Sequence, residues 1–97
     1  MEIILDGINI KSENDLHAIL AEKLDFGPYY GNNLAALWDR LTTDVERPVL
    51  LIWKNAAQSE AAIGEPTFVK IVKLFQDVEQ QDRDFGRINR FCFDYDK

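Results

Sequence analysis

Val49–Trp53 (VLLIW) is the longest strongly apolar run in the chain, and Pro48 stands directly before it. A short continuous apolar run is typical of a β-strand that is covered on both faces. We therefore predict that residues 49–53 form the central strand of a sheet, with Trp53 in the core.

Segments with helical spacing lie on both sides of this run. Before it, residues 34–41 keep helical spacing, and the side chain of Asn33 can cap this helix. After it, Pro66 fits the first turn of another helix, which we expect to end within residues 80–86. The apolar stripes consist of Leu34, Leu37, Trp38 and Leu41 in the first helix and of Phe68, Ile71, Val72, Phe75 and Val78 in the second.

Two β-prone runs lie near the ends of the chain. Residues 2–5 (EIIL) end at a turn signal, and residues 88–93 alternate as in a last strand. Ser12 and Asp15 resemble a capping box, so we expect a helix from there to about Leu24. Residues 55–64 lack a clear stripe, and a loop with one helical turn suits them.

The order of these segments predicts the fold class. Strands that alternate with helices pair in parallel through right-handed crossovers. Ninety-seven residues make one domain with one core. We predict a single α/β domain over residues 1–97, with a small three-stranded parallel sheet and helices packed against it; the strand order stays open.

The chain is acidic, with 17 acidic and 11 basic residues and a net charge of −6. Such a surface disfavours nucleic acids and anionic membranes as partners and favours a basic protein. The acidity could equally serve solubility alone. No apolar run approaches the roughly 18 residues of a membrane span, so we expect no membrane association.

Cysteine content and the N-terminus bear on the compartment. The only cysteine, Cys92, cannot close a disulfide within the chain. Glu2 and Asp6 interrupt any signal-peptide pattern at the N-terminus. We therefore expect the protein in the reducing cytoplasm.

The segment before the 34–41 helix predicts a tight turn. Gly31, Asn32 and Asn33 all tolerate a positive φ angle, and this turn aims the helix. Beside the apolar stripe runs a second stripe, which we expect to face outward. Its members are Ala35, Asp39, Thr42 and, if the helix extends that far, Glu46.

Tyr29–Leu41 (YYGNNLAALWDRL) resembles the YYG-x-NL-x-ALWD-x-L signature of the barstar family, the small cytoplasmic inhibitors of secreted bacterial ribonucleases such as barnase. Weaker likeness extends from Asp15-Leu16-His17 to Val72–Phe75 and covers nearly the whole chain. The resemblance implies a similar fold. It also implies an immunity protein, monomeric when free, that binds a basic barnase-like ribonuclease one to one and blocks its active site.

The resemblance further implies which residues contact the ribonuclease. The carboxylate of Asp39 stands in for a substrate phosphate in the active site, and Tyr29 contacts the enzyme. From the residues themselves we expect one of Tyr29 and Tyr30 to pack beneath the turn and Trp38 to keep one edge exposed. The predicted partner-binding residues are Tyr29, Asn33, Leu34, Ala35, Trp38, Asp39, Thr42, Thr43, Asp44 and Asp77.

Three positions depart from the family pattern in charge. Ala35 stands where the best-known member carries an acidic residue, and Asp44 stands where it carries an aromatic one. Gln81 is neutral where the family has an acid. These changes motivate an alternative, in which the fold serves a different basic partner and inhibits no ribonuclease.

Nothing in the sequence indicates catalysis, a metal site or a cofactor. His17 is the only histidine, at the border of the apolar face of the helix expected from Ser12 to about Leu24, and no nucleophile or paired carboxylate is placed beside it. One cysteine and one histidine are too few for a structural zinc site. We expect no enzymatic activity; a hydrolase that uses Asp39, Glu46 or His17 is the least favoured hypothesis.

Overall fold

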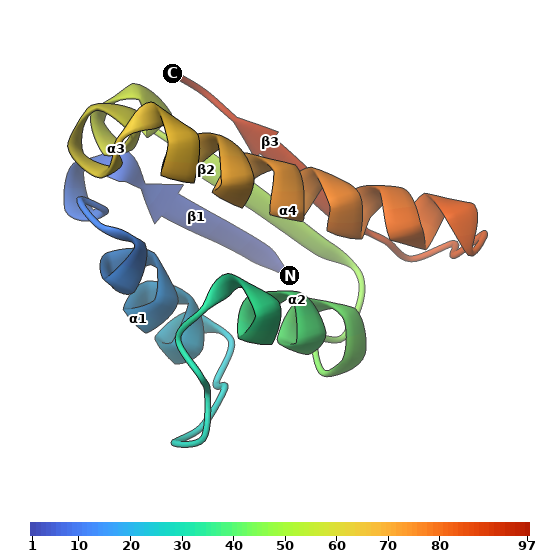
Figure 1. Ribbon diagram of the computed structural model, residues 1–97. Coiled ribbons are helices and arrows are strands. Elements are labelled where there is room, and N and C mark those ends of the chain that lie inside the picture. The colour runs from blue at the N-terminus through green and yellow to red at the C-terminus, as the bar shows by residue number, and fades with distance from the viewer.

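The computed structural model describes all residues from 1 to 97. Its three strands form one parallel sheet in the order β1-β2-β3, with β2 in the centre (Figure 1). The predicted fold class is confirmed. No helix combines the length and the hydrophobicity that a membrane-spanning segment needs. In chain order the elements are β1 (Glu2–Asp6), the 3-10 helix η1 (Gly7–Asn9), α1 (Glu13–Lys23), α2 (Leu34–Thr43), β2 (Val49–Lys54), α3 (Ala56–Ile63), α4 (Glu65–Asp84) and β3 (Phe91–Tyr95).

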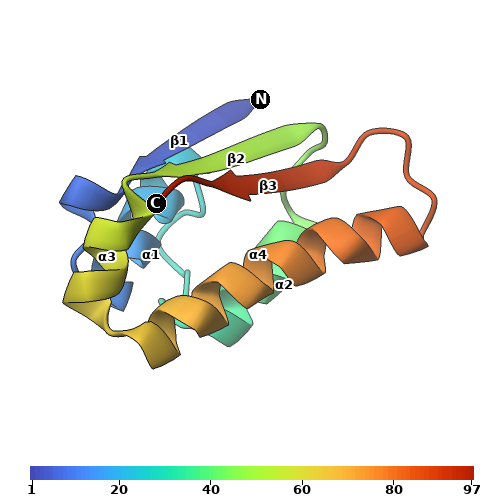
Figure 2. The same cartoon turned by 90° about the horizontal axis from the view of Figure 1, so that it is seen from above.

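The helices lie on one side of the sheet, as Figure 2 shows from above. Along β2, Val49, Leu51 and Trp53 are buried, whereas Leu50 is 38% exposed. The prediction that this strand is covered on both faces is therefore wrong. The strand order is the cause, because right-handed crossovers that advance across a sheet in one direction place all their helices on the same face.

The core lies between the sheet and the helices. Trp53 is fully buried, as predicted, and its ring centroid lies 5.2 Å from that of Phe68 in α4. Phe75 of α4 packs against Phe93 of β3, with the two ring centroids 4.9 Å apart. Both predicted apolar stripes are confirmed: the buried residues are Phe68, Ile71, Val72, Phe75 and Val78 of α4 and Leu37 and Leu41 of α2, with Leu34 and Trp38 half-buried beside them.

Residues 56–63 form the helix α3, where we predicted a loop with one helical turn. Alanine is the strongest helix former, which supports this segment locally. The hydroxyl of buried Ser59 donates to the carbonyl oxygen of Gly7 at 3.1 Å. A Cβ atom at Gly7 would lie 1.9 Å from the carbonyl oxygen of Asn55, so only glycine permits this approach. α3 is thus held by tertiary contacts that no apolar stripe reveals.

The C-terminal part of the chain differs from the prediction at the last strand. α4 ends at Asp84, within the segment where we expected it to end. β3 covers Phe91–Tyr95 and not residues 88–93, and Ile88 is 95% exposed in the connection. The start of β3 is held by α4: Asp82 is buried there, and its carboxylate accepts a hydrogen bond from the amide of Phe91 at 2.7 Å.

Candidate functional site

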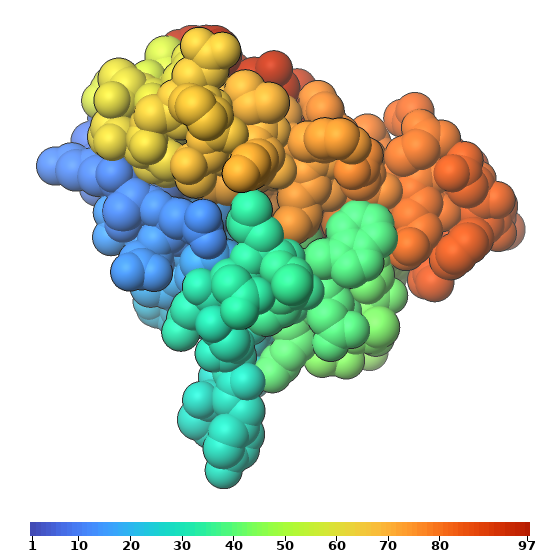
Figure 3. Space-filling view, in the orientation of Figure 1, coloured from blue at the N-terminus to red at the C-terminus, as the bar shows by residue number.

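The loop before α2 carries one packed and one exposed tyrosine, as predicted. Tyr30 is buried, and its ring centroid lies 4.7 Å from that of Phe26. Tyr29 is 91% exposed. The loop projects below α2 in Figure 3. It therefore presents an aromatic side chain to solvent on a base that is anchored in the core.

His17 anchors this loop from α1. Its side chain is fully buried, so the prediction of a position at the border of the apolar stripe is wrong. Nδ1 lies 2.6 Å from the hydroxyl oxygen of Tyr30, and Nε2 lies 2.9 Å from a carboxylate oxygen of Glu13. Nδ1 thus joins α1 to the loop, and Nε2 is engaged within α1, so both ring nitrogens have a structural role.

The hydroxyl of Tyr30 should make stability sensitive to alkali. Burial, together with the charge of Glu13, raises the pKa of Tyr30 to about 12, although Arg40 opposes the shift. Because an unfolded tyrosine titrates near pH ~10, this contribution is complete below that pH and is lost as the pH rises towards about 12. We expect the unfolding free energies of wild type and Tyr30→Phe, measured in urea, to converge over this range. A constant difference would contradict the expectation.

Asn32 and Asn33 have different roles in the turn before α2. Of the three residues expected to tolerate a positive φ angle, only Asn32 uses it, at 52°. Asn33 caps α2 as predicted: its side-chain oxygen accepts a hydrogen bond from the amide of Ala36 at 2.8 Å. This capping role is structural. Because Asn33 is exposed, its side chain also borders the outer surface of α2.

Asn33→Ala is expected to lower the free energy of unfolding by about 1 kcal/mol, because an amide at the helix N-terminus loses its acceptor. Serine also caps helices, so Asn33→Ser is the matched control and should lie within about 0.5 kcal/mol of wild type. Urea denaturation followed by tryptophan fluorescence measures both variants. Equal losses would show that capping is not what Asn33 contributes.

The outward stripe of α2 carries one free carboxylate, that of Asp39. Ala35 and Asp39 are exposed, as predicted. The Thr42 hydroxyl donates to the carbonyl oxygen of Trp38 at 2.7 Å, and the Thr43 hydroxyl donates to that of Asp39 at 2.6 Å. The Asp39 carboxylate itself makes no hydrogen bond or ion pair in the molecule. It is therefore available to a cation from outside.

The other two acids among the predicted binding residues are paired within the molecule. Asp44 Oδ2 lies 3.5 Å from Nε of Arg40, and Asp77 Oδ2 lies 2.8 Å from Nζ of Lys73. Exposed pairs of this kind contribute little to stability. They do reduce the negative charge that these two positions offer to a partner.

The predicted binding residues come from two neighbouring parts of the fold. All except Asp77 lie on the loop before α2, on α2 or at its C-terminal cap, and Asp77 lies on α4. α4 packs against α2, and Figure 3 shows the two on the same face. Gln81, one turn after Asp77, is half-buried. Neither of the two surface hollows involves the loop or α2, although Asp77 lines one of them. The loop projects from the molecule (Figure 3) and suits a cleft on another macromolecule.

The side chains form no arrangement typical of a metal or catalytic centre. No group of three or more His, Cys, Asp or Glu side chains could hold a metal ion. Cys92 is a free, half-buried thiol in β3, and both ring nitrogens of His17 in α1 are already engaged by Tyr30 and Glu13. The chemistry that the site offers is therefore binding by a fixed anion.

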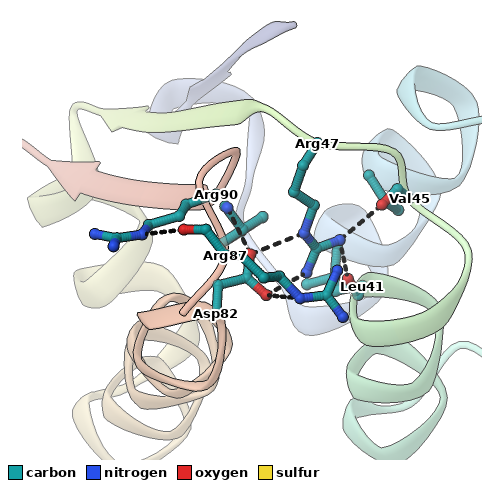
Figure 4. A network of polar contacts seen from close by, with 7 residues as sticks. Leu41, Val45, Arg47, Asp82, Arg87 and Arg90 are labelled. Carbon is teal, nitrogen blue, oxygen red and sulfur yellow. Dashed lines mark hydrogen bonds and ion pairs between the residues drawn. The ribbon is translucent and has the colours of Figure 1, made fainter. Parts of the chain in front are cut away.

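A buried ion pair, which we did not predict, lies between the C-terminal end of α2 and α4 (Figure 4). Arg47 donates from Nε to Oδ2 of Asp82 at 2.8 Å. It also donates from Nη1 to the carbonyl oxygens of Leu41 and Val45, at 2.6 and 2.7 Å. The two charged side chains are only 7% and 1% exposed. The pair connects the end of α2 to α4.

Asp82 stays charged despite its burial. Burial alone raises its pKa, but the hydrogen bonds from Arg47 and the Phe91 amide, with the charges of Arg47 and Arg87, hold the pKa below the ordinary value. One sequence signal was present: Asp82 follows Val78 by four residues and continues the apolar stripe of α4. An acid on such a stripe is buried only when it is paired. Nothing in the local pattern identifies Arg47 as the partner.

Comparisons with known proteins agree with this geometry. The family model described as Barstar (barnase inhibitor) matches residues 1–93, from β1 into β3. A curated protein of Bacillus subtilis (strain 168), "Putative ribonuclease inhibitor YrdF", is 37% identical over 87 residues, which cover 90% of this chain and 94% of that protein. The similarity therefore extends well beyond the loop and α2.

Proposed function

The chain belongs to the barstar family, and from this premise we propose that it inhibits a basic, barnase-like ribonuclease by binding one to one over the active site. The family is one of inhibitors and not of enzymes. The loop before α2 and α2 itself make most of the contact. Asp77 of α4 lies at its edge.

The observation that carries the proposal is the free carboxylate of Asp39. It is the only acid within α2, it is exposed, and it has no partner in the molecule. A ribonuclease binds the phosphates of RNA with cationic side chains. A carboxylate on a rigid helix is a preorganised anion that such side chains hold through charge-assisted hydrogen bonds. Asp39 therefore takes the place of a substrate phosphate.

The aromatic residues of the loop and α2 supply the apolar part of the contact. Tyrosine combines a large rigid surface with a polar tip and is a common interface anchor. Tyr29 has this role, since it is exposed while Tyr30 holds the loop to the core. The half-buried Trp38 adds its free edge. The rim consists of Asn33, Leu34, Ala35, Thr42, Thr43 and Asp44.

The net charge of −6 supports the choice of a basic partner. An acidic surface steers a cationic enzyme into contact and raises the association rate, and salt weakens this effect. Binding takes place in the cytoplasm, where the free thiol of Cys92 stays reduced. The complex protects the cell from the nuclease.

A second candidate function is binding of a different basic partner without ribonuclease inhibition. The pattern of acids favours it: position 35 is alanine, and Asp44 and Asp77 are each paired with a cation one turn earlier. Among the predicted binding residues, only Asp39 offers an uncompensated charge. A partner that presents one cationic pocket fits such a surface as well as a ribonuclease does.

Calorimetric titration of a purified barnase-like ribonuclease tests the proposal. We expect one-to-one binding, loss of RNA cleavage in the complex, and weaker binding at high salt. A mononucleotide phosphate that occupies the ribonuclease active site should compete with the inhibitor. Binding without this competition and with continued RNA cleavage would favour the second candidate. Absence of binding at both low and high salt would reject the ribonuclease proposal.

A further inference from the structure

We propose that Arg47 is a positioning residue for ribonuclease binding, because it fixes the C-terminal end of α2 against α4 and so sets the placement of Asp39. The inference rests on the proposed function. Arg47 does not itself reach a partner, since its side chain is only 7% exposed. Its effect passes through the helix that it holds.

One edge of the guanidinium holds α2. The helix ends at Thr43, so the carbonyl oxygen of Leu41 has no amide of its own helix as donor. Nη1 of Arg47 donates to this oxygen at 2.6 Å and to the carbonyl oxygen of Val45 at 2.7 Å. A cation there also complements the negative end of the helix dipole. Arg47 therefore satisfies a C-terminal carbonyl of α2 from beyond the C-cap residue Asp44.

The other edge of the guanidinium holds α4. Nε and Nη2 of Arg47 lie 2.8 and 3.3 Å from the two carboxylate oxygens of Asp82. This two-point contact fixes the plane of the group. Asp82 also accepts the amide hydrogen of Phe91 at 2.7 Å and lies 3.5 Å from Nε of Arg87. The carboxylate is thus tied to α4 and to the start of β3, and Figure 4 shows these contacts converging on it.

The bridge through Arg47 is the directional contact between α2 and α4. No hydrogen bond or ion pair joins the two helices directly, and apolar packing has no preferred direction. The other tertiary polar contact of α2 is from Arg40 to the carbonyl oxygen of Phe26 at 2.7 Å, which holds the loop and not α4. The relative placement of Asp39 on α2 and Asp77 on α4 therefore depends on Arg47.

Lysine cannot replace Arg47 in this arrangement. An ammonium group has the same charge but one nitrogen, so it cannot hold Asp82 at two points and also cap Leu41. Arg47→Lys thus keeps the charge and removes the geometry. Arg83→Lys is the matched control, because Arg83 lies on α4 with a side chain that is 54% exposed.

The experiment compares wild type, Arg47→Lys and Arg83→Lys under conditions in which circular dichroism shows all three folded. Amide hydrogen exchange, followed by NMR, reports on residues 41–44 with α1 as the internal reference. We expect faster exchange in residues 41–44 of Arg47→Lys but not in its α1. We expect roughly tenfold or faster release of the ribonuclease in stopped-flow measurements, with little change in the association rate because the charge is kept. Arg83→Lys should match wild type.

The outcomes separate the inference from the proposed function. If the wild type binds and Arg47→Lys releases the ribonuclease at the wild-type rate, the inference is overturned and the proposed function stays intact. Equal acceleration of exchange in α1 and α2 also overturns it, because Arg47 would then stabilise the whole fold without positioning α2. A wild type that does not bind overturns the proposed function, and the binding role of Arg47 with it.

A second variant tests the inference if Arg47→Lys does not fold. In the double variant Arg47→Met, Asp82→Asn, neutral side chains replace the buried ion pair, and the amide oxygen at position 82 can still accept from the amide of Phe91. The carbonyl oxygens of Leu41 and Val45 still lose their donor. We expect the same faster release of the ribonuclease, and release at the wild-type rate would overturn the inference.

Discussion

Asp39→Ala is expected to weaken ribonuclease binding by roughly 30-fold to several thousand-fold, which corresponds to about 2 to 5 kcal/mol. The variant removes the only free carboxylate of α2 and leaves the cations of the enzyme's active site buried without a counter-charge. The fold should be unaffected, because this side chain is exposed and makes no hydrogen bond or ion pair in the molecule. Calorimetry measures the dissociation constant, and urea denaturation measures the stability.

Asp96→Ala is the matched control for Asp39→Ala. Asp96 is exposed, and its side chain makes no hydrogen bond or ion pair. Figure 1 places the C-terminus far from α2. The control changes the net charge equally, so it measures long-range attraction alone, and we expect a loss of less than about fivefold. A loss as large as that of Asp39→Ala would contradict the role of Asp39.

Asp82→Asn is expected to lower the free energy of unfolding by about 3 to 5 kcal/mol at neutral pH, because it leaves the buried Arg47 without its counter-charge. The amide has nearly the same shape and can still accept from the amide of Phe91, so no cavity contributes. Asp84→Asn is the control, since Asp84 is exposed on the same helix, and it should stay within about 0.5 kcal/mol of wild type. Urea denaturation measures both; similar losses would contradict the expectation.

The effect of Asp82→Asn should diminish in acid. Burial works against ionisation of Asp82, but its contacts with Arg47 and the Phe91 amide hold its pKa in the folded state below the ordinary value. A depressed pKa contributes stability above about pH 4, where the unfolded carboxyl is ionised, and this contribution is lost as the pH falls below that value. We expect wild type and variant to converge as the pH falls below about 4. A difference that does not change with pH would refute this account.

Local sequence patterns predicted most of the elements, because their physical causes lie within a few residues of each other. Asn33 caps an amide three residues ahead, and the apolar stripe of α4 repeats at helical spacing. The same periodicity predicted that Asp39 and Ala35 face outward. The binding role of these residues came from the signature in Tyr29–Leu41, since periodicity shows exposure and not a partner.

Other features were missed because their causes are tertiary. α3 has no apolar stripe and is held by a contact between Ser59 and Gly7, 52 residues apart. The open face of the sheet follows from the strand order, which local spacing does not contain. The full burial of His17 depends on Tyr30 and Glu13, which satisfy both ring nitrogens.

The sequence by itself therefore determined the helices α1, α2 and α4, the central strand, the cap of α2 and the outward position of Asp39. Only the tertiary structure decided how the buried charge of Asp82 is compensated. The cations that pair with Asp44 and Asp77 lie one helical turn away in the chain, whereas Asp82 is bound to Arg47 across 35 residues. The reason is physical: periodicity in a helix depends on spacing along the chain, whereas the energy of an ion depends on distance and burial in space.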